Sequence, residues 1–314
     1  MLIGNYFKKI NFKYKDHFFS GLSFNSSTCK KHSIFFAIKG NESDGNKFIK
    51  SAIKNGARTI VSSQKYQGIK DQILYINSLN IRKSLAETAF NLCNLKPRNL
   101  IAVTGTNGKS SIANFYFQIL RFNKKKVASI GTLGVQTTSK RLSVSNTTLD
   151  PIKLSAHLKN LKNYLKSKLY LFKKLLRKNS NIITDIEIPE YNKIKDISLK
   201  RKLNIHTISN HKSDLRIISH KYFNSKQLIK ISYKNQFYEF KTNLIGKIQI
   251  KNILMAMIAA EKSNLKFKRI VNVISKIKAV NGRLEKVGKI KNNSTVILDY
   301  AHTPDALKTC LKNL

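Results

Sequence analysis

Cysteine is scarce in this 314-residue chain, and the three residues, Cys29, Cys93 and Cys310, are widely separated. That spacing and odd number fit neither a disulfide framework nor a metal cluster, and they are typical of a reducing cytoplasm. The sequence also has no apolar run of about 18 residues, and its N-terminal stretch MLIGNYFKKI is too short and polar for a secretory signal. We therefore expect a cytoplasmic protein that is not inserted in a membrane.

Acidic residues are also few, with 16 Asp and Glu against 59 Lys and Arg, which gives a formal net charge of +43. Such a charge would by itself indicate a nucleic acid or an anionic membrane as partner. The lysines, however, are scattered from Lys8 to Lys312 among many Asn and Ile residues, as a biased codon usage would produce. The sequence contains no arginine-rich block, zinc-ligand spacing or RNA-binding aromatic pair. We expect no specific nucleic-acid partner, although such a positive surface could be attracted to anionic lipid.

The chain is long enough for about two domains, and 41% of its residues are hydrophobic. Its first part alternates short β-like runs with helical stretches, which predicts a small α/β domain over residues 1–95. Pro97 would end the preceding helix and form a hinge before a second domain, residues 96–314. The predicted strands are residues 34–38, 59–62 and 72–76, and the predicted helices are residues 46–55 and 81–93.

A glycine-rich stretch, VTGTNGKSS over residues 103–111, is the strongest functional signal in the sequence. It follows an apolar run at 100–103 and precedes a helical pattern at 111–122, the context of a phosphate-binding loop. Gly105 and Gly108 would allow a tight turn whose N–H groups face phosphate oxygens at a helix N-terminus. Lys109 would reach the β- and γ-phosphates, and the Ser110 hydroxyl would hold Mg²⁺. The pattern departs from the usual one, which has a glycine where Val103 stands.

The second domain continues the strand and helix alternation, which predicts a mostly parallel sheet. Residues 222–240 have period-two patches typical of an antiparallel hairpin with its turn at Lys234, Asn235 and Gln236. The fold class we expect is α/β: a small N-terminal α/β domain plus a phosphate-loop central domain with a mostly parallel sheet. The predicted elements are strands at 100–103, 127–130, 181–184 and 203–207, a helix at 252–263, and a last buried strand at 295–298 that ends at Asp299.

Several further motifs stand in a fixed order along the chain. They are SFNSS at 23–27, DGNKFIKSAIKNGA at 44–57, GTLG at 131–134, NTTLDP at 146–151, YLKSKLYLF at 164–172, NGRLE at 281–285 and DYAHTPDAL at 299–307. With the phosphate loop, this order resembles the Mur ligase family over nearly the whole chain. The resemblance implies an ATP- and Mg²⁺-dependent amide ligase of peptidoglycan precursor synthesis. Its substrates would be UDP-N-acetylmuramoyl-L-Ala-D-Glu and a third amino acid, diaminopimelate or lysine.

The same resemblance implies roles for individual residues. Lys109 and Lys168 would be catalytic, with Lys168 carbamylated so that it joins Ser110 in holding Mg²⁺. Alternatives stay open for several of these residues: Lys168 as an ordinary lysine of a basic helix, Asp299 as a solvated strand-terminal residue, Thr147 and Thr148 as part of a loop before Pro151, and the loops at 25–26 and 44–45 as plain turns. The glycine-rich stretch itself could be a plain turn with a solvated lysine. The implied substrate residues are Asn25, Ser26, Asp44, Gly45, Thr147 and Thr148, and the implied ATP residues are Gly105, Thr106, Asn107, Gly108, Lys109, Ser110, Ser111, Asn252, Arg283, Asp299 and His302.

The chain also departs from the family pattern in two places. Only residues 152–162 separate two motifs between which the family has a long insert with a metal-binding glutamate, and the family's acceptor-binding C-terminal domain would lie beyond residue 314, the last residue of this sequence. We therefore expect the 314 residues to bind the sugar nucleotide weakly and to form no tripeptide at a useful rate. The alternatives are a non-catalytic nucleotide-binding fragment or degenerate relative and, more remotely, a basic nucleic-acid-binding ATPase.

Overall fold

The chain forms two compact units, Met1–Arg98 and Asn99–Leu314. The computed structural model describes residues 1–7, 10–40, 43–92, 98–105, 107–131, 133–139, 141–142, 169, 171–223, 226–301 and 304–314. Within these ranges, every helix is too short or too polar to cross a membrane.

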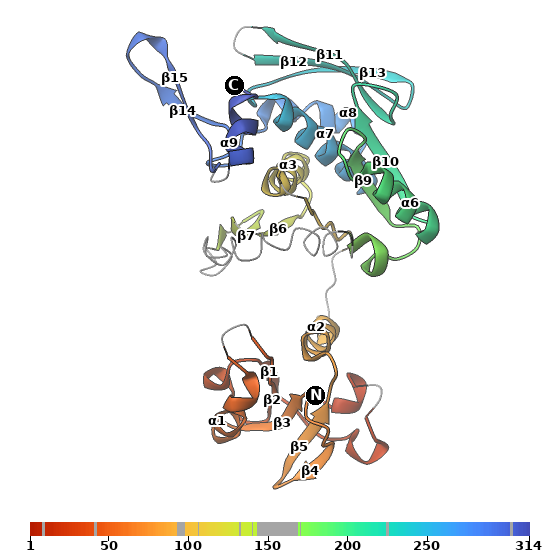
Figure 1. Cartoon of the computed structure of the whole chain (residues 1–314), viewed down its shortest axis with the longest axis vertical. Helices are drawn as coiled ribbons and strands as arrows, with labels where there is room; N and C mark the ends of the chain where they lie inside the picture. The colour runs from red at the N-terminus through yellow and green to blue at the C-terminus, as the bar shows by residue number, and fades with distance from the viewer. Residues whose placement is uncertain are drawn as a thin grey trace. The chain divides into compact units, whose positions relative to one another are not determined.

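The first unit is built on a five-stranded sheet with the order β1-β2-β3-β5-β4, in which only the edge strand β4 is antiparallel (Figure 1). Short helical turns precede the sheet and link its strands. The strands are β1 (Gly21–Ser23), β2 (Ser33–Phe36), β3 (Ala57–Ser62), β4 (Gly68–Lys70) and β5 (Ile73–Asn77). The helices are α1 (Ile49–Lys54) and α2 (Ile81–Leu92), with turns η1 (Ile3–Asn5), η2 (Phe12–Tyr14), η3 (Ser26–Thr28) and η4 (Gly45–Phe48).

Both faces of this sheet are covered, which explains why three consecutive residues of β2, Ile34, Phe35 and Phe36, are apolar. Ile34 and Phe36 pack with Ile81 of α2 on one face, whereas Phe35 packs with Ala52 of α1 on the other. Strands buried on both faces are apolar at every position, as parallel strands in α/β folds are. The predicted strands of this region and its second helix are confirmed, while the predicted helix 46–55 consists of η4 followed by α1.

The second unit contains a mixed five-stranded sheet with the order β13-β12-β11-β10-β9. Strands β9 to β11 are parallel, and β11 to β13 form an antiparallel meander. Lys234 and Asn235 have φ values of 51° and 59°, the two positive values of a type I′ hairpin turn, so the predicted turn is confirmed. The strands are β9 (Asn181–Asp185), β10 (Asn204–Ser209), β11 (Leu215–Phe223), β12 (Lys226–Tyr233) and β13 (Gln236–Thr242).

Helix α7 (Lys247–Lys262) lies at the centre of the second unit. It packs against α3 (Lys109–Phe122) and against β9 and β10 (Figure 1). Its apolar side chains are therefore buried nearly all round. This packing fixes the helix that follows the phosphate loop. The remaining helices and turns are α6 (Tyr191–Arg201), α8 (Phe267–Val271), α9 (Pro304–Leu311), the π-helical turn η5 (Leu171–Leu175), η6 (Ile274–Lys276) and η7 (Lys291–Asn293).

Three strand predictions for the second unit need correction. Residues 100–103 form no strand, and Leu100 is 83% exposed, because no strand among the described residues pairs with them. The strand predicted at 127–130 exists but is antiparallel, in the sheet of β6 (Ala128–Gly131), β7 (Gly134–Thr137) and β8 (Arg141–Leu142). The strand β15 (Thr295–Leu298) is largely exposed rather than buried, because it pairs only with β14 (Glu285–Lys289) in a two-stranded ribbon.

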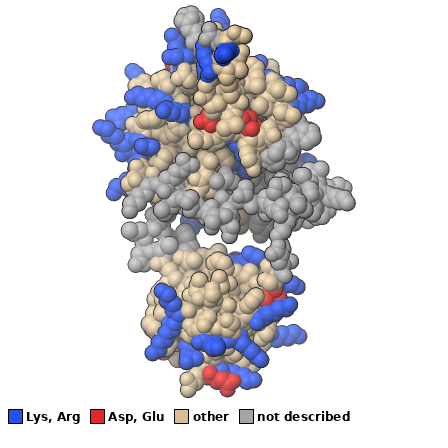
Figure 2. Space-filling model, turned by 90° about the vertical axis from the view of Figure 1, so that its left-hand side faces the viewer, with Lys and Arg blue, Asp and Glu red and all other residues tan. Residues whose placement is uncertain are grey.

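Lysine and arginine side chains are spread over the face of each unit that Figure 2 shows, and few acidic side chains interrupt them. They do not gather in one stripe on that face. This distribution agrees with the interpretation of the high net charge as a property of composition.

Candidate functional site in the second unit

The phosphate loop turns into α3 at Gly108, which has a φ of 79° and a ψ of −11°. This left-handed conformation favours glycine, and the helix begins at the next residue, Lys109. The Lys109 ammonium folds back and donates a hydrogen bond to the Gly105 carbonyl oxygen at 3.0 Å. Ser110 and Ser111 occupy the first turn of the helix, where backbone N–H groups lack carbonyl partners within the helix. The turn therefore offers a cation, N–H groups and a hydroxyl to one ligand.

Helix α7 approaches this turn so closely that Gly108 has no room for a side chain. A Cβ atom at position 108 would lie 2.4 Å from the Asn252 Oδ1 atom. Asn252 is itself buried, at 5% exposure. Asn252, which the sequence linked to ATP only through the resemblance, is thus placed against the phosphate loop.

The segment around residues 282–300 contributes a second cation to the same region. Partial burial, and next to it the positive charge of Arg283, lower the pKa of Lys109, so the two cations lie near each other. The Arg283 guanidinium lies 5.0 Å from the centre of the Tyr300 ring and donates to the Tyr300 carbonyl oxygen at 3.4 Å. Asp299 accepts a hydrogen bond from the Leu284 N–H at 2.8 Å, which joins the two ends of this segment. Two cations near each other are suited to a polyphosphate.

Gln249, which the sequence analysis did not single out, connects these parts. Its side chain accepts a hydrogen bond from Asn252 Nδ2 at 3.1 Å and donates one to the Arg283 carbonyl oxygen at 2.9 Å. Gln249 precedes Asn252 by three residues, so both lie on one face of α7. That spacing was the one signal in the sequence that could have pointed to it.

An ion cluster beside Asn252 was also missed. Lys251 Nζ lies 2.6 Å from Asp185 Oδ2 and 2.7 Å from Glu187 Oε2, at the carboxyl end of β9. The hydrogen bond from Lys251 is the main reason why the pKa of Glu187 falls to about 2, although burial opposes the shift. Burial would lower the pKa of Lys251, but its bonds to the two carboxylates outweigh this and raise it. The cluster therefore holds α7 to the sheet.

We expect this cluster to make the stability of the protein pH-dependent. Glu187 has a folded-state pKa of about 2 against an ordinary 4.5, so its contribution is complete above about pH 4.5 and is lost as the pH falls toward 2. Replacing Lys251→Met should lower the free energy of unfolding at neutral pH and flatten its decline below pH 4.5. Urea unfolding at a series of pH values measures both effects. Parallel pH profiles for the two proteins would show that Lys251 does not cause the shift.

Five of the predicted site residues lie outside the described residues: Thr106, Thr147, Thr148, Lys168 and His302. Their roles stay predictions. Cys93 and the predicted hinge at Pro97 lie outside the described residues as well. Asn107 is described and exposed, next to Gly108 in the loop.

Candidate substrate residues in the first unit

The four residues that the sequence assigns to the sugar nucleotide in this unit lie on two loops, and both loops contact α1. Asn25 caps η3 by accepting from the Ser27 N–H at 3.0 Å, and Asp44 caps η4 by accepting from the Asn46 N–H at 2.9 Å. Gly45 has no space for a Cβ atom, which would lie 2.5 Å from the Ile38 nitrogen. The Ser26 carbonyl accepts from Asn55 Nδ2 at 2.9 Å. Each loop is therefore well ordered by local hydrogen bonds.

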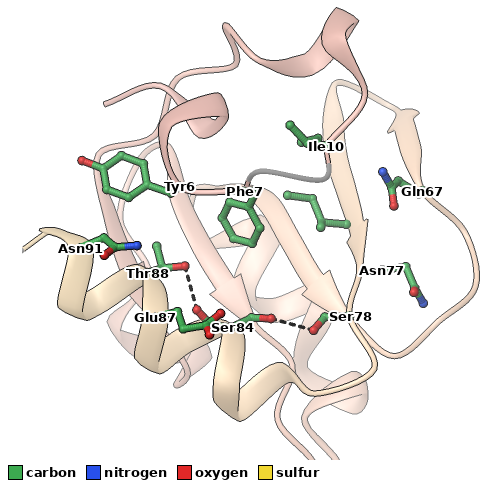
Figure 3. Close-up of a pocket in the computed structure, with 11 residues that line it drawn as sticks. Tyr6, Phe7, Ile10, Gln67, Asn77, Ser78, Ser84, Glu87, Thr88 and Asn91 are labelled. Carbon is green, nitrogen blue, oxygen red and sulfur yellow. Dashed lines mark hydrogen bonds between the residues drawn. The ribbon is translucent and has the colours of Figure 1, made fainter. Parts of the chain in front are cut away.

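A separate open cavity of about 600 Å³ lies between α2, the N-terminal segment and the end of β5 (Figure 3). It contains none of the four residues assigned to the sugar nucleotide. Glu87 is the one charged side chain among the described residues that line it, so the cavity is poorly suited to a diphosphate. The lining residues are Tyr6, Phe7, Ile10, Gln67, Ile76, Asn77, Ser78, Ser84, Glu87, Thr88 and Asn91.

Two family models match the chain: the catalytic domain of the Mur ligase family over residues 19–90 and the Mur ligase middle domain over residues 154–260. A UDP-N-acetylmuramoyl-L-alanyl-D-glutamate–2,6-diaminopimelate ligase of Rickettsia montanensis is 31% identical over 351 residues, covering 96% of this chain and 72% of the relative. The chain belongs to the Mur ligase family. The ligase of the same name from Rickettsia conorii is 32% identical with the same coverage. The resemblance inferred from the motifs is thus confirmed.

Solved structures agree with this Mur ligase fold. A structure of a diaminopimelate ligase of the same name superposes with a TM-score of 0.78 at 21% identity, over 98% of this chain and 72% of the other. A MurF ligase of Thermotoga maritima in complex with ADP superposes with a TM-score of 0.65, also at 21% identity, over 93% and 74%. The sequence alignments span 351 positions, more than the 314 residues of this chain, so the relatives contain residues that have no counterpart here. The predicted α/β fold class is confirmed.

Proposed function

We propose that this Mur ligase binds ATP with Mg²⁺ in its second unit and UDP-N-acetylmuramoyl-L-Ala-D-Glu in its first. The observation that supports this most is the convergence of three segments on the phosphate loop: Lys109 at the start of α3, Asn252 from α7 and Arg283 from the segment before β14. The relatives at 31% and 32% identity bear the name of a diaminopimelate ligase, so we propose diaminopimelate rather than lysine as the amino acid added. Since ATP and the sugar nucleotide are cytoplasmic metabolites, the protein would act in the cytoplasm.

The reaction is a phosphoryl transfer followed by an acyl transfer. The D-glutamate γ-carboxylate attacks the γ-phosphorus of ATP and ADP leaves, which gives an acyl phosphate. The neutral amine of the third amino acid then attacks the acyl carbon, phosphate leaves with the electron pair of the broken C–O bond, and the nitrogen gives up one proton to water as the amide forms. Lys109 and Arg283 would neutralise phosphate charge, Asn252 and Asp299 would orient the nucleoside, and positioning would supply most of the rate.

Magnesium fits this site as an ion held mainly by the nucleotide. The Ser110 hydroxyl stands in the first turn of α3, where a phosphate-loop hydroxyl binds the metal. Across the described residues, no three His, Cys, Asp or Glu side chains gather into a metal cage. Mg²⁺ commonly keeps several waters and is bound through substrate phosphates, which needs few protein ligands. When bound, the ion would neutralise charge on the transferred phosphoryl group, and a carbamylated Lys168 would add an oxygen ligand.

A ligation assay tests this proposal. The chain would be incubated with ATP, Mg²⁺, UDP-N-acetylmuramoyl-L-Ala-D-Glu and either diaminopimelate or lysine, and the tripeptide product and released phosphate would be measured. Product with diaminopimelate but not with lysine would support the full proposal and would contradict the expectation, drawn from the two departures of the sequence, that the chain forms no tripeptide at a useful rate. Binding of both nucleotides without product would favour the non-catalytic alternative. The residues of the relatives that have no counterpart in this chain support that alternative. Absence of ATP binding would contradict the proposal.

A further inference from the structure

Gln249 is one of the most deeply buried polar residues of α7, at 2% exposure, and both the nitrogen and the oxygen of its carboxamide make hydrogen bonds. Its Nε2 donates to the Arg283 carbonyl oxygen at 2.9 Å, and its Oε1 accepts from Asn252 Nδ2 at 3.1 Å. A buried amide that lost either bond would leave a polar group without a partner. The side chain is therefore held between two segments that are 31 residues apart in the sequence, at positions 252 and 283.

The chemistry of these partners sets the direction of both amides. A backbone carbonyl can only accept a hydrogen bond, so the amide nitrogen of Gln249 must face Arg283. Its oxygen then faces Asn252, which must present its own nitrogen in return. The Asn252 oxygen is thereby directed to Gly108, where it occupies the space of the missing Cβ. The orientation of Asn252 at the phosphate loop is thus dictated by the Arg283 carbonyl through Gln249.

Gln249 also fixes the position of Arg283. The Arg283 side chain stacks on Tyr300, and its positive charge acts on Lys109. By holding the Arg283 backbone against α7, Gln249 keeps the second cation beside the phosphate loop. One buried carboxamide thus fixes both the cation and the carboxamide that lie at the phosphate loop.

We propose that Gln249 is a positioning residue for ATP. Its hydrogen bond to the Arg283 carbonyl fixes the orientation of its own amide, which in turn fixes the orientation of the Asn252 carboxamide, and it holds both residues against the phosphate loop. This inference rests on the proposed binding of ATP at that loop. Gln249 acts through its two neighbours and not by contact with the nucleotide.

Replacing Gln249→Glu separates positioning from simple packing, because only the protonated carboxyl can donate to the Arg283 carbonyl. Burial raises the pKa of a carboxyl, so the side chain should change from carboxylate to acid between about pH 8 and about pH 5.5. We compare the ATP affinity of the variant with that of the wild type at the same pH. The variant should bind about tenfold more weakly than the wild type at the higher pH, and at most about threefold more weakly at the lower pH. Gln249→Met, of similar size, should lose about tenfold at both pH values.

The matched control is Gln227→Glu in β12. Gln227 is also 2% exposed and donates to a backbone carbonyl, that of Leu244, while its Oε1 lies 2.6 Å from His220 Nε2, so these hydrogen bonds lie outside the three segments of the site. Titration calorimetry with ATP and Mg²⁺ on the full chain gives all affinities, at a temperature where circular dichroism shows each variant folded. Gln227→Glu should leave the affinity ratio near one at both pH values.

The inference is overturned if both Gln249 variants bind ATP like the wild type, or if Gln227→Glu shows the same pH-dependent loss. Both results leave the proposed function intact, because wild-type binding remains. A wild-type chain that does not bind ATP would contradict the proposed function itself and the inference with it.

Discussion

Replacing Lys109→Ala should weaken the binding of ATP with Mg²⁺ by about 10- to 150-fold, on the order of 1.5 to 3 kcal/mol. The Lys109 ammonium is the cation at the start of α3, and it donates a hydrogen bond to the Gly105 carbonyl oxygen. Partial burial and Arg283 lower its pKa, so an arriving polyphosphate would relieve the repulsion between the two cations. Titration calorimetry measures the loss directly.

The control for Lys109→Ala uses exposed lysines just beyond the other end of the same helix. Lys125→Ala and Lys126→Ala each remove one charge from a chain of net charge +43, as Lys109→Ala does, but away from the phosphate loop. ATP affinity should change little in either, because exposed charges more than about 10 Å from a ligand are screened by salt. Equal losses in all three variants would mean that only the overall charge attracts ATP.

A methyl group added at Gly108 should be the most disruptive small change in the loop. The φ of 79° costs any other residue about 1 to 2 kcal/mol, and the new Cβ would in addition lie 2.4 Å from Asn252 Oδ1. Asn252 cannot move aside without breaking its bond to Gln249. We therefore expect Gly108→Ala to lower the free energy of unfolding by about 1 to 3 kcal/mol more than backbone strain alone does. It should also abolish measurable ATP binding.

Gly282→Ala is the matched control for this steric effect. Gly282 has a φ of 68°, similar to that of Gly108, but a Cβ at position 282 would have no atom within 4 Å. Urea unfolding should therefore show only the strain of the backbone in that variant. The double variant Gly108→Ala with Asn252→Ala should recover part of the lost stability, since it removes the oxygen that the methyl group meets. If both alanine variants were equally destabilised, close approach of α7 would not be the reason for glycine at 108.

Local signals in the sequence were enough to predict much of this site. The glycines, lysine and serines of the phosphate loop are consecutive, and their spacing alone predicts the turn and the helix that follows. The hairpin turn at Lys234 and Asn235 was predictable for the same reason. Asn252 and Arg283 entered only through the resemblance, because no local pattern shows that a residue 144 positions after Gly108 lies against it.

What the sequence could not predict depends on partners that are distant along the chain. Residues 100–103 have the composition of a strand, but a strand also needs a neighbour to bond with, and none of the described strands pairs with them. The run at 295–298 is apolar enough for a core, yet it pairs only with β14 and stays exposed. Gln249 and Lys251 look like ordinary helix residues, and their roles follow from contacts with Arg283, Asp185 and Glu187.

Hydrogen exchange with and without ATP and Mg²⁺ tests most directly whether these three segments form one nucleotide site. We predict slower amide exchange on ATP addition in residues 107–112, 249–252 and 281–285 of the wild type, and a clearly smaller effect in Lys109→Ala at an ATP concentration that just saturates the wild type. The first unit should be unaffected by ATP. Slower exchange only in the first unit, or none at all at saturating ATP, would contradict the assignment of the ATP site to the phosphate loop.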